Sequence, residues 1–243
     1  MKISVAVPVY DSRLLIQVVQ SIMSEQLMSV LDGDTIQFSF VGGNAGIVQA
    51  RNEMAYRFMR SDFDRLVMLD ADVSFEPGAL LKLAHHEADV VAGVYRFKMD
   101  GPENYPMRFL PDPDKRGIPL RRDGLIEVEA APTGFLAISR VALQKFEDAF
   151  PERLKMHFGQ ETFSYFQMPI NDGIIFGEDY WFCKEWRDLG GSVFVDPEIP
   201  LTHWSTSPVA YAGHVGNWIK SKNTPQSISK PQEGGTDEQS LAV

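Results

Sequence analysis

Two acidic residues follow directly on a short apolar segment, in the run Leu66-Val67-Met68-Leu69-Asp70-Ala71-Asp72. In an extended chain, residues at positions i and i+2 point the same way, so the carboxylates of Asp70 and Asp72 face one spot. Open α/β sheets place their ligands just beyond the carboxyl ends of the strands. Paired carboxylate oxygens at that place suit Mg²⁺ or Mn²⁺ bridging to phosphate groups. The plain alternative is an Asp that caps the turn after a strand.

Two later positions could add to such a site. Glu178 and Asp179 begin a segment of helical spacing that is rich in aromatic residues, so a carboxylate there would be held rigidly, as a general base requires. Acids at the start of a helix are also favoured by the helix dipole alone. His203 follows an apolar segment and is a candidate nitrogen ligand for an ion such as Mn²⁺. Taken alone, it would be an ordinary surface histidine.

The elements that must position these residues alternate between strand and helix. Strands are expected where short apolar runs rich in β-branched residues occur, at 3–9, 36–41, 65–69 and 89–97. Helices are expected where apolar residues recur at helical spacing, at about 13–27, 47–60 and 77–87. This alternation predicts a parallel sheet covered by helices, which belongs to the α/β class. Tyr95, Arg96 and Lys98 end the fourth strand at the same edge, where they either meet phosphate or sugar or are solvated.

The remainder of the chain is less regular. Strands are expected at 125–131, 135–139 and 192–195, and helices at 140–150 and 178–189. Residues 98–124 are rich in Pro, Gly and charged residues and indicate a long surface loop. Residues 221–243 contain almost no apolar side chains, so we expect a disordered polar tail there.

Composition excludes several classes of protein. The chain has 243 residues, with 23 Lys and Arg against 33 Asp and Glu, which gives a net charge of −10. This balance argues against nucleic-acid binding, which needs a basic face. Cys183 is the only cysteine, which excludes an internal disulfide and a cysteine-based zinc cluster. No run of about 18 apolar residues is present, so we expect no membrane insertion. The absence of a signal-peptide pattern favours a cytoplasmic location.

Six segments, taken in order, resemble a family 2-type glycosyltransferase of the GT-A fold: VAVPVYDS, ARN, LVMLDADV, PTGFLAISR, GEDYWFCKEWRDLGG and LTHWS. The resemblance covers roughly residues 3–205. It implies a nucleotide-diphospho-sugar transferase fold with a mostly parallel central sheet flanked by helices. It also implies one catalytic domain over residues 1–220, in which 1–98 hold the nucleotide and 99–220 the acceptor, followed by the tail 221–243.

The resemblance assigns roles to single residues. Those implied for the nucleotide sugar are Pro8, Tyr10, Asp11, Arg51, Asp70, Ala71 and Asp72. Those implied for the divalent cation, Mn²⁺ or Mg²⁺, are Asp70, Asp72 and His203. Those implied for the sugar or the acceptor are Thr133, Gly134 and Trp181, although Trp181 could equally fill the core. Asp179 resembles the general base of inverting members, with Glu178 as the fallback.

The implied activity is the transfer of a single sugar from a UDP- or GDP-sugar to an acceptor hydroxyl, with a glycan as the first candidate acceptor and inversion as the expected course. Two features depart from the common pattern of the family. The first strand ends in Tyr10-Asp11-Ser12 in place of Tyr-Asn-Glu. The Gln-x-x-Arg-Trp motif of processive members is absent, which favours a soluble enzyme over a polysaccharide synthase.

Two alternatives belong to other classes. A haloacid dehalogenase-type phosphatase would use Asp70 as its nucleophile, but that family carries its motif on the first strand, and here two β-α units come first. A non-catalytic module that holds a sugar or a partner would keep the fold without the chemistry, yet both acid pairs and the histidine are intact. Loss of activity in Asp179→Asn with donor binding retained separates an enzyme from a binding module. A trapped phosphoaspartate at Asp70 indicates the phosphatase.

Overall fold

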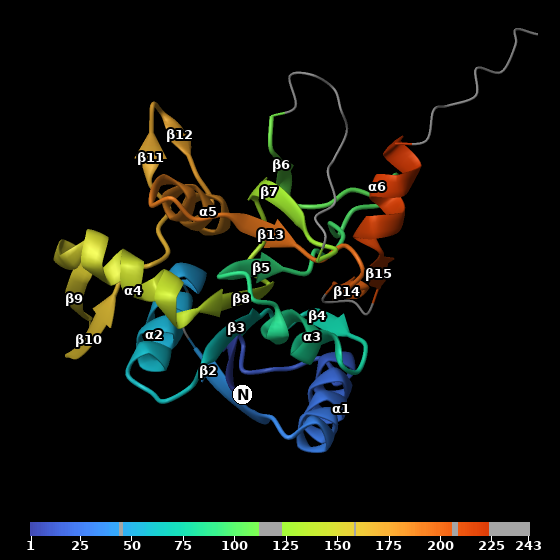
Figure 1. Ribbon diagram of the computed structural model, residues 1–243, viewed down its shortest axis with the longest axis horizontal. Helices are drawn as coiled ribbons and strands as arrows, with labels where there is room; N and C mark the ends of the chain where they lie inside the picture. Colours follow the sequence, from blue (N-terminus) through green and yellow to red (C-terminus); the bar gives the residue numbers. More distant parts are fainter. Residues whose placement is uncertain (44–45, 112–122, 158, 206–208, 224–243) are drawn as a thin grey trace, which may run out of the picture.

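An eight-stranded sheet runs through the middle of the molecule, with helices on both of its faces (Figure 1). The computed structural model describes residues 1–43, 46–111, 123–157, 159–205 and 209–223. The strands, in their order across the sheet, are β2 (Thr35–Gly42), β1 (Lys2–Val9), β3 (Arg65–Leu69), β8 (Phe135–Ser139), β5 (Val90–Ala92), β13 (Val193–Val195), β7 (Ile126–Ala130) and β6 (Arg108–Phe109).

The predicted mostly parallel sheet is confirmed. Strand β1 pairs in parallel with β2 and β3, and β13 pairs in parallel with β5. Strand β8 lies antiparallel between β3 and β5, and β7 lies antiparallel between β13 and β6, so six of the eight strands run the same way. Because β8 comes from the second half of the chain, the segments 1–98 and 99–220 contribute to one sheet.

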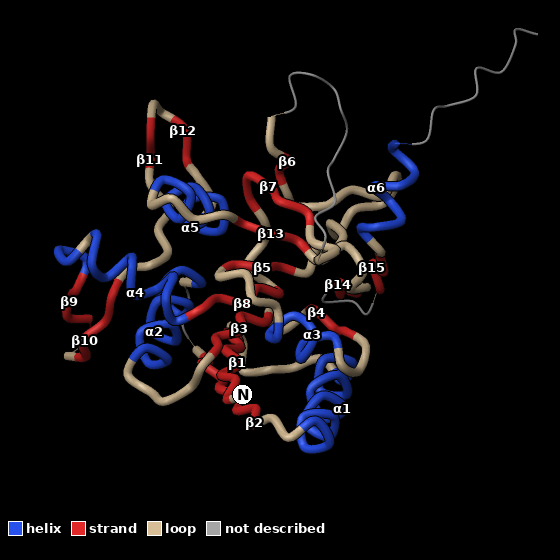
Figure 2. Tube along the Cα trace, viewed as in Figure 1, coloured by secondary structure: helices blue, strands red, loops and turns tan. Residues whose placement is uncertain are grey.

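The helices form two layers, one on each face of the sheet (Figure 2). Helices α2 (Ile47–Met59), α4 (Arg140–Ala149) and α5 (Glu178–Asp188) bury apolar side chains in one core. Helices α1 (Ile16–Asp32) and α3 (Ala79–His85) pack on a second core on the other face. Successive residues of β3 point to opposite cores, as a strand's period of two requires: Leu66 and Met68 face the first, Val67 and Leu69 the second.

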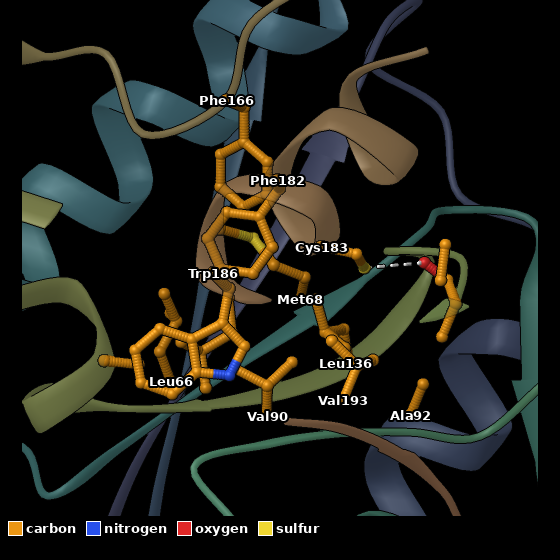
Figure 3. Close-up of a cluster of buried hydrophobic side chains, with 14 of the residues drawn as sticks. Leu66, Met68, Val90, Ala92, Leu136, Phe166, Phe182, Cys183, Trp186 and Val193 are labelled. Atoms are coloured by element: carbon orange, nitrogen blue, oxygen red, sulfur yellow. Dashed lines mark hydrogen bonds between the residues drawn. The ribbon is translucent and has the colours of Figure 1, made fainter. Parts of the chain in front are cut away.

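Helix α5 is anchored in the first core by its aromatic side chains (Figure 3). Phe182 and Trp186 are fully buried and stack on Phe146, with ring centroids 5.0 and 6.5 Å away. The Cys183 thiol donates to the carbonyl oxygen of Ala131 at 3.6 Å, and burial raises the pKa of this thiol to about 12. This packing fixes the start of α5, where the predicted Glu178-Asp179 pair lies.

Several elements differ from the prediction. The fourth strand spans only Val90–Ala92, so Tyr95 to Lys98 lie in the segment after it. A second sheet, of which the sequence indicated only the strand at His203, consists of β4 (Val73–Phe75), β14 (Leu201–Trp204) and β15 (Ala210–Gly213). A short 3-10 turn and two small hairpins occupy the irregular region, at Pro151–Arg153, β9 (Leu154–His157) with β10 (Gln160–Phe163), and β11 (Ile170–Asn171) with β12 (Ile174–Ile175).

The last described helix is α6, Val215–Asn223, which continues into the first residues of the expected polar tail. The rest of the tail, 224–243, and residues 112–122 of the expected surface loop lie outside the described residues. In the described part of the chain, no helix combines the length and the apolar character that crossing a membrane requires.

A buried carboxylate, Asp196, ties helix α3 to the end of strand β13. Its side chain is 3% exposed and accepts from His86 Nε2 at 2.9 Å, from Lys82 Nζ at 2.8 Å and from the backbone N–H of Glu198 at 2.9 Å. Burial alone would raise the pKa of this carboxyl, but these donors outweigh burial and lower it to about 2.

Asp196→Asn is expected to lower the free energy of unfolding by about 2 kcal/mol at pH 7, since a pKa depressed from 3.8 to about 2 corresponds to roughly that amount. The folded-state pKa is the lower one. The stabilisation is therefore complete above about pH 4 and is lost as the pH falls toward 2. Denaturant unfolding of both proteins at several pH values measures this, with the exposed Asp148→Asn as the control. A difference that stays constant down to pH 2 would contradict it.

Candidate active site

The two acid pairs meet at one buried arginine, Arg51 of helix α2. One amino group of its guanidinium donates to Asp70 Oδ1 at 2.8 Å, and the other donates to the carboxylate of Glu178. The Arg51 side chain is 4% exposed. Burial alone would lower the pKa of Arg51, but the two carboxylates raise it, so the group stays charged. The fork of the guanidinium thus joins the end of β3 to the start of α5.

Asp70 is held where strand β3 ends beside the start of the antiparallel strand β8. Its backbone N–H donates to the carbonyl oxygen of Gly134 at 2.9 Å, one step beyond the Leu69–Phe135 pair of the sheet. A Cβ atom at Gly134 would lie 2.5 Å from Asp70 Oδ2 and 2.6 Å from the Tyr95 ring. Only glycine therefore allows the carboxylate and the tyrosine to approach this backbone. Thr133, the residue before it, is buried.

Gly134→Ala is expected to lower the free energy of unfolding by about 1–3 kcal/mol, the usual cost of overpacking. The added methyl group would push either the Asp70 carboxylate or the buried Tyr95 ring out of place. Chemical denaturation measures the loss. A change below about 0.5 kcal/mol would mean that neither side chain is confined there.

Asp72 pairs with His203 and Lys98, whereas Asp70 pairs with Arg51. Strand β14 runs antiparallel to β4, with His203 opposite Val73, and the N–H of Trp204 donates to the carbonyl oxygen of Asp72 at 2.9 Å. This pairing places His203 Nε2 3.6 Å from Asp72 Oδ1. On the other oxygen, Asp72 accepts from the ammonium of Lys98. Burial alone would raise the pKa of Asp72, but His203 and Lys98 lower it.

The hydrogen bonds of His203 determine which of its nitrogens is free. Nδ1 lies 2.9 Å from the carbonyl oxygen of Arg96, which can only accept, so Nδ1 carries the proton. Neutral His203 then turns the lone pair of Nε2 toward Asp72 Oδ1. Two acceptors that face each other need a shared cation, either a proton or a metal ion. Metal-bound histidines typically have this arrangement, with the second nitrogen donating to a carbonyl group.

Tyr95 fills the space between these groups. It is 9% exposed, its ring centroid lies 4.5 Å from that of His203, and it contacts the backbone at Gly134. Burial first, then the charges of Asp70 and Asp179, raise the pKa of its phenol well above the ordinary value, so it is neutral. From the sequence, Tyr95 could either meet phosphate or sugar or be solvated, and its position just beyond the fourth strand was the only signal of this place in the site.

The two acids at the start of α5 have different surroundings. Glu178 is engaged by Arg51, whereas the one hydrogen bond that Asp179 Oδ1 accepts from the described residues comes from the adjacent N–H of Tyr180, at 2.7 Å. Within the described part of the chain, no cation is paired with Asp179. Asp179 is therefore the carboxylate of this pair that is available to take a proton.

The other predicted residues lie around this cluster. Trp181 is half-buried, packs on Phe176 with centroids 5.5 Å apart, and its buried Nε1 has no hydrogen-bond partner among the described residues. Ala71 packs against the second core. Pro8 is buried in β1, whereas Tyr10 is 74% exposed, and Asp11 is exposed as well. Because β1 and β3 pair in parallel, Pro8, Tyr10 and Asp11 lie at the same carboxyl ends of the strands as Asp70. They are not among the described residues with which Arg51 pairs.

The metal ligands expected from the sequence are only partly assembled. Among the described residues, no three His, Cys, Asp or Glu side chains gather closely enough to hold an ion by themselves. Asp70 turns to Arg51, which leaves Asp72 and His203 as a pair. This carboxylate and imidazole fit Mn²⁺ or Mg²⁺ as a two-ligand site, because such ions commonly take their remaining ligands from phosphate groups and water.

No protein-family model and no curated protein sequence matches the chain. Solved structures do. One is Drosophila β1,4-galactosyltransferase 7, as a mutant in complex with manganese, UDP-Gal and xylobiose, at 13% identity and a TM-score of 0.44, covering 98% of this chain and 82% of that one. Another is S. aureus TarS in complex with UDP-GlcNAc, at 13% identity and a TM-score of 0.41, covering 80% of this chain and 56% of that one.

A third match is the inositol-1-phosphate CTP transferase of T. maritima, at 16% identity and a TM-score of 0.41, covering 91% of this chain and 96% of that one. Glycosyltransferases are thus among the solved structures that this chain resembles, as the sequence motifs led us to expect. The chain spans 56% of the TarS chain and 64% of the galactosyltransferase chain in a second structure. Likenesses this distant do not assign an activity, which must come from the site.

Proposed function

We propose that this chain is a glycosyltransferase that moves one sugar from a nucleoside-diphosphate sugar, UDP- or GDP-linked, to an acceptor hydroxyl, for which a glycan is the first candidate. One observation carries the proposal. Arg51 joins Asp70 to Glu178, so an acid pair for the donor and an acid pair for the acceptor meet at one edge of the sheet. Asp72, just before β4, and His203, on β14, form a second pair beside these residues.

On the donor side, the chain must bind two phosphate groups and accept the charge that builds up on the leaving oxygen. Asp72 and His203 would hold Mn²⁺ or Mg²⁺, which supplies the positive charge that stabilises a leaving diphosphate. Asp70, held by Arg51 and by the backbone of Gly134, would orient the ribose. Pro8, Tyr10 and Asp11 would border the base.

On the acceptor side, Asp179 would take the proton of the attacking hydroxyl. An unaided hydroxyl group has too high a pKa to attack, so a carboxylate within hydrogen-bond reach is needed. The acceptor oxygen then forms a bond to the anomeric carbon, the bond from that carbon to the diphosphate breaks, and the nucleoside diphosphate leaves. Attack from the face opposite the leaving group inverts the anomeric carbon. Trp181, three residues along α5 from Glu178, would border the acceptor.

The two alternative functions, a phosphatase and a non-catalytic binding module, fit this site less well. A phosphatase needs the Asp70 carboxylate free for attack, yet Oδ1 accepts from Arg51 and Oδ2 lies against Gly134. A binding module needs no free carboxylate beside the donor site, yet Asp179 is one. These points favour the transferase, and loss of turnover in Asp179→Asn with donor binding retained would separate it from a binding module.

Thermal unfolding with a panel of nucleoside diphosphates and sugar nucleotides, with and without Mn²⁺, tests the proposed donor site. Saturation at about 100 times the Kd adds about 2.7 kcal/mol of stability, which raises Tm by several degrees. We expect a shift with one nucleotide base, dependent on Mn²⁺ and lost in Asp72→Asn. If no nucleotide raises Tm in the presence of Mn²⁺, the donor-site assignment is wrong.

A further inference from the structure

The proposed cation site already contains a positive charge, the ammonium of Lys98. Lys98 donates to Asp72 Oδ2, and the opposite oxygen, Oδ1, lies 3.6 Å from His203 Nε2. The Lys98 ammonium and the His203 imidazole thus lie one on each oxygen of Asp72, the carboxylate proposed to bind the metal ion. A divalent cation on Asp72 would therefore have to share that carboxylate with a like charge.

The backbone that carries Lys98 is fixed close to Asp72. Tyr95 is buried in the site, and the carbonyl oxygen of Arg96 accepts from His203. The N–H of Phe97 donates to the carbonyl oxygen of Asn104 at 3.0 Å. The position of the Lys98 backbone is thus set by several contacts, while its four-carbon stem leaves the ammonium able to move.

The ion pair itself is weak enough to exchange partners. The Lys98 side chain is 30% exposed and that of Asp72 is 38% exposed. A pair this open to solvent changes an equilibrium by no more than about fivefold. A divalent cation with two protein ligands and a diphosphate can displace such a partner, so Lys98 competes with the cation without blocking it.

We propose that Lys98 is the counter-ion of Asp72 in the donor-free protein and that it moves from Asp72 to the donor's diphosphate when a divalent cation binds. This inference rests on the proposed function, since it needs a cation on Asp72 and a diphosphate beside it. Lys98 is then a donor-binding residue as well. It neutralises the acidic site before the donor arrives and adds a charge-assisted hydrogen bond to phosphate afterwards.

The test measures two affinities that should change in opposite directions. Mn²⁺ binding without nucleotide is followed through the electron paramagnetic resonance signal of free Mn²⁺, in the wild type, Lys98→Gln and Lys98→Arg. Lys98→Gln should bind Mn²⁺ about fivefold more tightly, because the competing ammonium is gone, whereas Lys98→Arg should keep the wild-type affinity. With Mn²⁺ saturating, Lys98→Gln should bind UDP or GDP at least about fivefold more weakly.

The matched control is Lys2→Gln, which removes an exposed lysine that pairs with Asp62 at the amino end of β1. It should change neither the Mn²⁺ affinity nor the nucleotide affinity. Unchanged or weaker Mn²⁺ binding in Lys98→Gln, or unchanged nucleotide affinity, would overturn the role of Lys98. Asp72→Asn distinguishes a failure of the Lys98 inference from a failure of the proposed metal site. If it abolishes Mn²⁺ binding while Lys98→Gln changes nothing, only the Lys98 inference fails. If neither the wild type nor Lys98→Gln binds Mn²⁺, either alone or with UDP or GDP present, the metal site fails as well.

Discussion

Asp179→Asn is expected to lower kcat for sugar transfer by about 10²–10⁴-fold while the Kd for the donor nucleotide stays unchanged. An amide in place of this carboxylate cannot take the proton of the acceptor hydroxyl. The fold should not suffer, because within the residues that the structure describes the side chain accepts from the adjacent N–H of Tyr180, and an amide oxygen can accept from the same donor. Steady-state turnover together with nucleotide binding separates the loss of catalysis from a loss of binding.

The control for this variant is Asp188→Asn, at the other end of the same helix, where the carboxylate is exposed and pairs with Lys184. Its kcat should equal that of the wild type. A fall in kcat of less than about tenfold in Asp179→Asn would show that another group takes the proton. Glu178 is the alternative, although Arg51 already engages its carboxylate.

Arg51→Met is expected to lower the free energy of unfolding by about 3–5 kcal/mol and to abolish donor binding. The guanidinium is nearly fully buried and holds Asp70 and Glu178 together. Without it, two partly buried carboxylates face each other with no positive charge between them. Asp70 would also be free to turn away from its present position beside Gly134. Denaturant unfolding measures the stability, and calorimetric titration with nucleotide measures the binding.

The matched control is Arg57→Met, on the same helix, where the arginine side chain is 60% exposed and pairs with Glu53. An exposed pair of this kind is worth about 0.2–1 kcal/mol, so the variant should be nearly as stable as the wild type. Equal stability losses in the two variants would mean that Arg51 acts only as an ordinary helix residue. Arg51→Lys adds a second check, because an ammonium cannot form the fork that reaches both carboxylates.

The sequence pattern predicted the first half of the sheet well, for a simple physical reason. Parallel strands that are buried on both faces read as continuous apolar runs, and β1 and β3 are such runs. The amphipathic segments between them have to cover the sheet. The place of β8 could not be read in the same way. Its insertion between β3 and β5 depends on pairing between segments far apart in the chain, which no local period encodes.

The hairpin of β11 and β12 was missed although the sequence contains its signal. Asp172 and Gly173 both have positive φ angles, 50° and 77°, as a two-residue hairpin turn requires. An Asp-Gly pair between apolar residues is among the strongest short-range signals for such a turn. The flanking strands have only two residues each, which is too short to show a period.

The candidate site, too, was predictable where it depends on residue types and spacing, and not where it depends on contacts between distant elements. Residue types and spacing singled out the chemistry, with Asp70 and Asp72 after a strand and Asp179 at the start of a helix. The role of Arg51 as the link between the acid pairs could not be predicted, because it depends on the distance between α2, β3 and α5. The contact of Lys98 with Asp72 likewise required the path of the chain after β5.

The central claim is that this site breaks the bond between a sugar and a nucleoside diphosphate. The most direct test is mass spectrometry of a sugar nucleotide that has been incubated with Mn²⁺, candidate glycan acceptors and either the wild type or Asp179→Asn. We predict that the wild type releases the nucleoside diphosphate and lengthens an acceptor by one sugar, and that Asp179→Asn does both at least about 10²-fold more slowly. Release of a nucleoside monophosphate with a sugar phosphate, or turnover in Asp179→Asn within about tenfold of the wild type, would contradict this claim.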